Sequence, residues 1–120
     1  MNNDTSEVIR RFNVAFQQHE PALLAEIIAD DCVLENTGPA PNGARYEGRA
    51  ACLTFWQGIA TDPGIRFTIE EVRTFGEHAL IFWRLSWGEG DASSVRGVNI
   101  MRVRAGLIVE GRGYIKGGAK

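Results

Sequence analysis

The sequence contains few of the residues that build metal centres or disulfide frameworks. It has two cysteines and two histidines among its 120 residues. Cys32 and Cys52 lie among apolar residues without a CxxC spacing, so we expect buried, reduced thiols rather than a disulfide or a zinc site. His19 and His78 are too far apart in the sequence to suggest a shared metal ion. We therefore expect a protein with no metal and no cofactor.

Long apolar runs and clusters of basic charge are also missing. No segment approaches the length that spans a bilayer, and the N-terminal MNNDTSEVIRR lacks the apolar run of a secretory signal. The net charge is −2 and the basic residues are scattered, whereas a phosphate-binding surface needs clustered Lys and Arg. These absences predict a cytoplasmic protein that binds neither nucleic acid nor a membrane.

The composition that is present suits one folded domain. Hydrophobic residues make up 44% of the chain and charged residues 23%, which is ordinary for a globular protein. A chain of 120 residues can bury one core but is too short for two. We therefore expect a single domain over residues 1–120.

Apolar residues at helical spacing predict three helices in the first half of the chain. The side chains of Asp4, Thr5 and Ser6, together with Glu7, predict a capping box at the start of the first helix. Pro21 suits the first turn of a second helix, which we expect to end at residues 30–31. The other elements expected here are a short strand over residues 32–36, a Gly- and Pro-rich loop over 37–45 and a third helix over about 48–59.

The second half of the chain loses helical spacing and predicts a run of strands. Strands are expected over residues 65–74, 79–87, 94–104 and 106–116. Their connections are short, which favours an antiparallel meander. Three helices followed by a run of strands is an α+β pattern, in which the helices cover one face of a curved sheet.

Three local phrases resemble those of known proteins. The stretch IIADDCVLEN resembles a junction in ketosteroid isomerases, whereas ALIFWRLSWGEG and VNIMRVRAGLIVEGRGY resemble the final strands of SnoaL-like polyketide cyclases and limonene epoxide hydrolases. With the order of elements, residues 7–116 thus resemble the nuclear transport factor 2-like superfamily. The resemblance implies a cone-shaped, cystatin-like α+β barrel with an internal cavity. It leaves the chemistry open, because this fold hosts isomerases, cyclases, hydrolases and binding proteins.

The residues that the resemblance aligns with ketosteroid isomerases differ from that family's catalytic groups. Asn36 stands where those enzymes keep an aspartate base, and Phe12 stands where they keep a tyrosine donor. Asn99 replaces a protonated aspartic acid, and its NH₂ group can still donate a hydrogen bond. An amide takes no proton at neutral pH, so we expect no steroid isomerisation by that route.

The match to limonene epoxide hydrolases is also partial. Asn36 matches an asparagine that holds the attacking water, and Arg84 matches the arginine of an Asp-Arg-Asp relay. Ser86 and Gly113 stand where that relay has its two acids, and SnoaL-like cyclases also commonly use an acid near Gly113. The resemblance therefore gives Asn36, Arg84 and Asn99 as catalytic candidates. The ligand-binding candidates are Phe12, Phe16, Trp56, Phe82, Ser86, Met101 and Gly113.

The face that each strand turns toward the cavity depends on the register. If Asn99 points inward, alternation places Met101 inward too. The family register also turns Phe82, Arg84 and Ser86 inward, and we adopt it. Hydrophobicity alone favours the opposite set, and Arg84 then becomes a surface residue packed on a tryptophan. That more apolar set is Ile81, Trp83, Leu85 and Trp87.

These observations predict a small-molecule pocket protein whose ligand is apolar or weakly anionic. If the protein is catalytic, the resemblance implies a SnoaL-like isomerase, cyclase or hydrolase without the usual carboxylates. The alternatives are a carrier or sensor of a hydrophobic ligand, and a dimerisation domain with a vestigial pocket. Both faces of strands 79–87 and 94–104 are largely apolar, so we also expect a homodimer through the outer face of the sheet.

Overall fold

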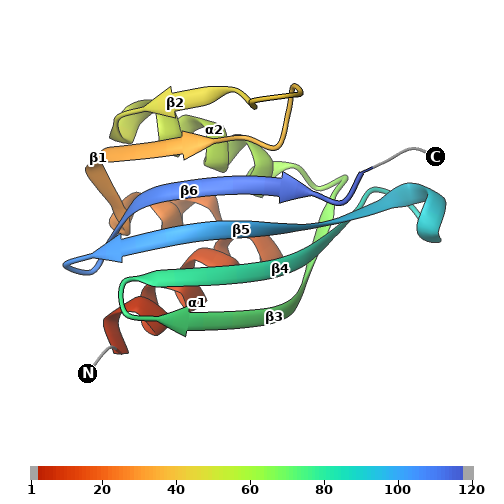
Figure 1. Cartoon of the computed structure of the whole chain (residues 1–120). Coiled ribbons are helices and arrows are strands. Elements are labelled where there is room, and N and C mark those ends of the chain that lie inside the picture. The colour runs from red at the N-terminus through yellow and green to blue at the C-terminus, as the bar shows by residue number, and fades with distance from the viewer. Residues whose placement is uncertain (1–2, 118–120) are drawn as a thin grey trace.

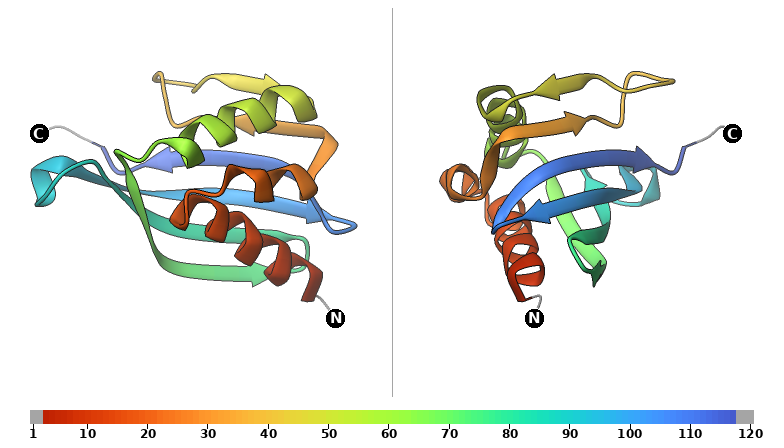
Figure 2. Two further views of the ribbon diagram at one scale, coloured as in Figure 1. Left: turned by 180° about the vertical axis from the view of Figure 1, so that it is seen from behind. Right: turned by 60° about the vertical axis from the view of Figure 1, so that its left-hand side comes forward.

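The computed structural model describes residues 3–117 and arranges them in two layers, with the helices on one side of a curved sheet (Figure 1, Figure 2). No helix within this range is both long and apolar enough to cross a membrane. The helices are α1 (Asn3–Gln17), η1 (Pro21–Glu26), α2 (Arg49–Thr61) and the short η2 (Asp91–Ser93). The strands are β1 (Ile28–Glu35), β2 (Arg45–Glu47), β3 (Arg66–Phe75), β4 (His78–Ser86), β5 (Ser94–Arg104) and β6 (Leu107–Ile115).

The six strands form one sheet in the order β2-β1-β6-β5-β4-β3. All neighbours are antiparallel except β1 and β6, which run parallel. The expected α+β class and the mainly antiparallel, curved sheet are thus confirmed. The parallel pair places Leu34, near the end of β1, beside Gly111 of β6, although the two are far apart in the sequence. We call the face toward α1 and α2 the inner face and the opposite face the outer face.

The prediction of a second helix that ends at residues 30–31 is wrong beyond the first turns of that helix. η1 is a 3₁₀ helix that ends at Glu26, and residues 28–31 already belong to β1. Ile28 pairs with Ile108 of β6, and the Ile108 N–H donates to the Ile27 carbonyl at 2.7 Å. Apolar residues that looked helical by spacing are therefore buried by a distant strand. β2, a three-residue strand on the edge of the sheet, was also missed.

The predicted capping box at the start of α1 is not formed. The Thr5 hydroxyl donates instead to the Gly76 carbonyl at 2.8 Å, and Glu7 pairs with Arg10 at 2.7 Å. The first bond ties α1 to the turn between β3 and β4, and the second lies along the helix surface. The apolar stripe of α1 is buried as its spacing predicts, and its members are Val8, Ile9, Phe12, Ala15 and Phe16.

Candidate functional site

A pocket of about 200 Å³ lies between the helices and the inner face of the sheet. Its wall is mainly aromatic. Phe12 of α1 meets Trp56 of α2 edge to face, with ring centroids 5.1 Å apart. Phe67 of β3 meets Trp83 of β4 in the same way at 5.7 Å, and Phe16 joins the two pairs at 5.6 Å from Phe67. Such edge-to-face contacts fix the rings, so the aromatic part of the wall is preformed.

Glycines on the inner face leave room for the two tryptophans. A methyl group added at Gly97 would lie 2.5 Å from ring carbons of Trp83, and one added at Gly111 would lie 2.8 Å from a ring carbon of Trp56. These distances are far below normal carbon contacts, so each indole packs directly against a strand backbone. Gly97 and Gly111 are therefore packing positions, where a side chain would displace the wall.

Gly113, which the resemblance aligns with an acid of related enzymes, allows a close approach of neighbouring groups. An added methyl group there would lie 3.0 Å from the Thr37 methyl group and 3.2 Å from the Asn99 side-chain oxygen. The glycine thus lets the loop after β1 and the Asn99 amide approach β6. Gly113 lines the pocket without offering any side-chain chemistry.

Asn99 brings a side-chain amide to the inner face of β5. It lies opposite Ile81 of β4 and Gly113 of β6. The Trp83 indole Nε1–H donates to the Asn99 Oδ1 at 3.1 Å. Because an indole nitrogen can only donate, this bond identifies which end of the amide faces Trp83. The predicted inward direction of Asn99 agrees with its place in the pocket wall.

Asn36 also lines the pocket and shapes the loop that follows β1. Its Oδ1 accepts a hydrogen bond from the Thr37 N–H at 2.8 Å. Its own backbone N–H donates to the Ala44 carbonyl at 2.8 Å, which closes the base of the loop. The carbonyl end of this second amide is therefore used within the protein.

The register that we adopted for β4 is wrong. Trp83 pairs with Gly97, and Ile81 pairs with Asn99, so the apolar set of β4 shares the inner face with Asn99. Ile81 and Trp83 are 1% and 7% exposed. A shift of one residue exchanges the two faces of a strand, and here hydrophobicity decided the face rather than the family alignment.

Three predicted site residues of β4 consequently lie outside the pocket. Arg84 forms an ion pair with Glu70 at 3.4 Å and donates to the Ser94 hydroxyl at 3.1 Å, on the outer face. Phe82 shares that face, where it pairs with Val98. Ser86 is buried at the end of the strand but does not line the pocket. The Arg84 guanidinium, a predicted catalytic group, therefore lies outside the pocket.

The remaining predicted residues are on the inner side. Phe12, Phe16, Trp56 and Gly113 line the pocket together with the two asparagines. Met101 is fully buried on the inner face but forms no part of the wall. A methyl group added at Gly111 would lie 3.3 Å from the Met101 sulfur, so Met101 packs behind Gly111. The catalytic and ligand-binding roles of all these residues stay predictions.

Asn13 of α1 is a pocket residue that the sequence analysis missed. It is 7% exposed and lines the pocket next to the buried stripe of α1. Its side chain has no hydrogen-bond partner among residues 3–117. The sequence contained a signal for this residue. Asn13 directly follows Phe12 and precedes Phe16 by three positions, which places it on the apolar side of the helix.

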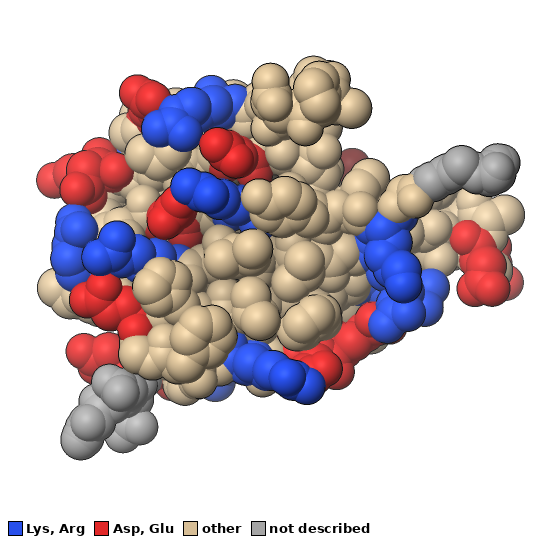
Figure 3. All heavy atoms as spheres, in the orientation of Figure 1, with Lys and Arg blue, Asp and Glu red and all other residues tan. Residues whose placement is uncertain are grey.

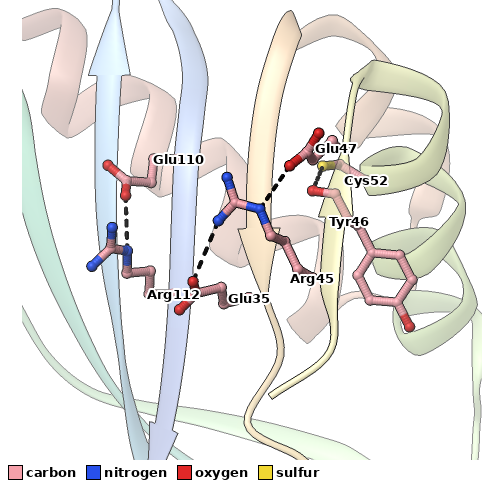
Figure 4. A network of polar contacts seen from close by, with 7 residues as sticks. All are labelled: Glu35, Arg45, Tyr46, Glu47, Cys52, Glu110 and Arg112. Atoms are coloured by element: carbon pink, nitrogen blue, oxygen red, sulfur yellow. Dashed lines mark hydrogen bonds and ion pairs between the residues drawn. The ribbon is translucent and has the colours of Figure 1, made fainter. Parts of the chain in front are cut away.

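The carboxylate nearest the pocket points away from it. Glu35 contributes to the wall, but its carboxylate lies 3.4 Å from Arg45 on the outer face, as alternation with Leu34 requires (Figure 4). Arg45 also pairs with Glu47 at 2.7 Å, and Arg112 with Glu110 at 2.8 Å. Across residues 3–117, no charged side chain therefore faces the pocket. The same residues contain no group of three His, Cys, Asp or Glu side chains placed to hold a metal ion.

The two thiols are not placed for nucleophilic chemistry. Cys32 and Cys52 are buried, as predicted, and the Cys52 thiol donates to the Cys32 carbonyl at 3.4 Å. Burial raises the pKa of both thiols above the ordinary value. Both sulfurs consequently stay protonated at neutral pH, and the pocket wall includes neither of them.

The curved sheet and the helices that cover one of its faces define a class of α+β proteins, and the family comparison identifies that class. The family model of the SnoaL-like domain matches residues 9–111, so this chain belongs to the SnoaL-like family. The predicted resemblance to the nuclear transport factor 2-like superfamily is thereby confirmed.

Solved structures agree with this assignment. An NTF2-like protein of unknown function from Mesorhizobium loti is 55% identical, with 96% of this chain and 93% of that chain covered and a TM-score of 0.90. A putative ketosteroid isomerase from Kribbella flavida is 21% identical over 98% and 82%, with a TM-score of 0.80. An LEH-like epoxide hydrolase from M. tuberculosis is 19% identical over 95% and 79%, with a TM-score of 0.74. The last two share the fold. No curated protein matches the sequence.

Proposed function

We propose that this protein binds an uncharged, mainly apolar small molecule in the pocket between its helices and sheet. The observation that carries the proposal is the composition of the wall. Aromatic and aliphatic side chains make up most of it, the amides of Asn13, Asn36 and Asn99 supply polar points, and within residues 3–117 no charged group faces it. Small-molecule sites have this character, with an apolar wall and a few placed polar groups. Since Arg84 lies on the outer face, the proposal no longer includes anionic ligands.

The wall favours a carrier or sensor over an isomerase, cyclase or hydrolase. Each of those reactions needs a group that takes or delivers a proton near the substrate. The relatives' acid positions hold Asn36 and Gly113 here, and the Glu35 carboxylate is directed to Arg45. An amide cannot accept a proton at neutral pH. A reaction in this pocket would therefore depend on a base supplied by the substrate or by water.

Ligand capture tests the proposal and separates these functions. Protein purified from its host is analysed by native mass spectrometry, and the released ligand is identified before and after long incubation with the protein. We expect an uncharged ligand that is recovered unchanged. A chemically altered ligand would establish an enzyme instead. Leu85→Trp fills the pocket from β4 and should abolish capture. Thr54→Trp adds the same side chain to the exposed side of α2 and should not.

We also propose that two copies of the chain pair through the outer face of the sheet. Paired residues of three strands form an apolar patch there: Leu80, Phe82, Val98, Ile100 and Tyr114. Ile100 is 38% exposed and Tyr114 is 50% exposed. Uncharged surface occupies the centre of this face, and charged side chains gather toward its borders (Figure 3). Exposed apolar surface with a polar rim is typical of a protein interface.

A further inference from the structure

Two of the three pocket amides are held in one orientation by groups that can only donate. The Asn99 Oδ1 accepts from the Trp83 indole N–H at 3.1 Å, and the Asn36 Oδ1 accepts from the Thr37 backbone N–H at 2.8 Å. Neither donor can accept a hydrogen bond in return. Turning either amide over would place its NH₂ group against another N–H, so the carbonyl end must face the protein.

The Trp83 indole is closely packed by its neighbours, which makes its effect on Asn99 directional. Its ring lies against the backbone of Gly97, so close that an added methyl group would be 2.5 Å from two ring carbons. Its edge-to-face contact with Phe67, at 5.7 Å between ring centroids, restricts the ring further. The indole N–H therefore points at Asn99 with little freedom to turn elsewhere.

The NH₂ group of Asn99 is left for the pocket. It has no acceptor among residues 3–117, and within the same range no fully buried side-chain nitrogen or oxygen lacks a partner. The Asn99 nitrogen must therefore keep accessible surface, and Asn99 lines the pocket. The Asn99 oxygen, in contrast, lies between the Trp83 indole and the backbone of Gly113. At this point Asn99 presents a free donor to the pocket, while its oxygen already accepts from Trp83.

We propose that Trp83 is a positioning residue that holds Asn99 as a hydrogen-bond donor, so that the pocket selects uncharged ligands through an acceptor oxygen, such as that of a ketone, ester or ether. This inference rests on the proposed binding function and names its ligand class. An alcohol of the same skeleton can also receive the Asn99 hydrogen bond, but its own O–H then finds no acceptor at Asn99, whose oxygen is taken by the Trp83 indole. An unpartnered buried hydroxyl costs enough to weaken binding by about tenfold or more.

Asn13 is the pocket amide that could obscure this preference, and the Thr37 hydroxyl is a second possible acceptor in the wall. The Asn13 amide has no partner that fixes its orientation, so it can accept from an alcohol as well as donate to a ketone. It lies on α1, whereas Asn99 and Trp83 lie on the sheet. Removing its polar atoms therefore serves as the matched control, because the preference that Asn99 imposes should persist without them.

The test compares three ligands of one skeleton by isothermal titration calorimetry: 1-tetralone, 1-tetralol and tetralin. The wild-type protein should bind 1-tetralone about tenfold or more tightly than 1-tetralol. Trp83→Phe keeps an aromatic ring and removes only the N–H donor, so the Asn99 amide can turn. In this variant we expect the affinities for 1-tetralone and 1-tetralol to differ by no more than about threefold. The affinity for tetralin should change much less. Asn99→Leu should remove the same preference by an independent route, and Asn13→Leu should retain it.

The outcomes separate the two proposals. Equal binding of the ketone and the alcohol by the wild type, or a preference that survives both Trp83→Phe and Asn99→Leu, would overturn the role of Trp83 and leave ligand binding intact. Failure of all three compounds to bind the folded wild type would contradict the proposed binding function and this inference with it. Circular dichroism of each variant confirms that the fold is kept, and the Asn99→Leu result decides if Trp83→Phe does not fold.

Discussion

Gly97→Ala should destabilise the protein although it adds only one methyl group. That methyl group would lie 2.5 Å from two ring carbons of Trp83 and 2.5 Å from the Tyr114 carbonyl oxygen. The indole is held by Phe67, and the carbonyl belongs to a paired strand, so neither neighbour can yield cheaply. Overpacking of this kind costs about 1–3 kcal/mol. The lower chain entropy of alanine returns about 0.5–1 kcal/mol, and the midpoints of the two ranges leave a net loss of about 1 kcal/mol.

Urea unfolding followed by circular dichroism measures this loss, and the melting temperature should fall by about 5 °C or more. Gly58→Ala is the matched control, because Gly58 is an exposed residue of α2 with no atom near the added methyl group. That change should stabilise the protein by up to about 1 kcal/mol, since alanine favours a helix over glycine. If Gly97→Ala unfolded at the wild-type urea concentration or above it, the packing of Trp83 against β5 would be wrong.

Three further predictions concern the outer face and the thiols. Arg84→Ala should leave the affinities for neutral and anionic ligands unchanged in calorimetric titrations, because Arg84 pairs with Glu70 outside the pocket; a selective loss of anion binding would restore the register that the structure rejects. Ile100→Glu should convert a dimer to a monomer in light scattering, and a wild type that is already monomeric at micromolar concentration would refute the proposed pairing. Cys32 and Cys52 should react with a thiol reagent slowly in the folded protein and fast in denaturant, since burial raises their pKa; fast native reaction would contradict their burial.

The strands of the second half could be predicted because short links and alternating side chains are local signals. The face of β4 was assigned wrongly, because the family register was preferred to the more apolar set that hydrophobicity favoured. Ile81, Trp83 and Leu85 face the pocket, while Leu80 and Phe82 take part in the outer patch. Alternation predicts which residues share a side and leaves open which side is covered by helices. Gly97 leaves room for the Trp83 ring on the inner face, and this pairing of Trp83 with Gly97 appears only once the strands are aligned.

The errors in the first half have a related cause. Residues 28–31 were predicted as helix because apolar residues recur there at helical spacing, whereas the partner that makes them a strand, Ile108, lies some eighty positions away. The spacing of apolar residues along the chain cannot predict a strand partner so far away in the sequence. Asn36 and Asn99 were found from the family resemblance, but the bonds that orient their amides were not, because they depend on Trp83 and on the loop after β1.

Nuclear magnetic resonance of the ¹⁵N-labelled protein tests the central claim most directly, because it observes the inner and outer faces in one titration. As 1-tetralone is added, the side-chain NH₂ signals of Asn99 and the indole N–H signal of Trp83 should shift together and saturate. The Nε–H signal of Arg84, on the outer face, should not move. A titration that shifts Arg84 and leaves Asn99 unchanged would contradict the account, because the ligand would then bind outside the pocket.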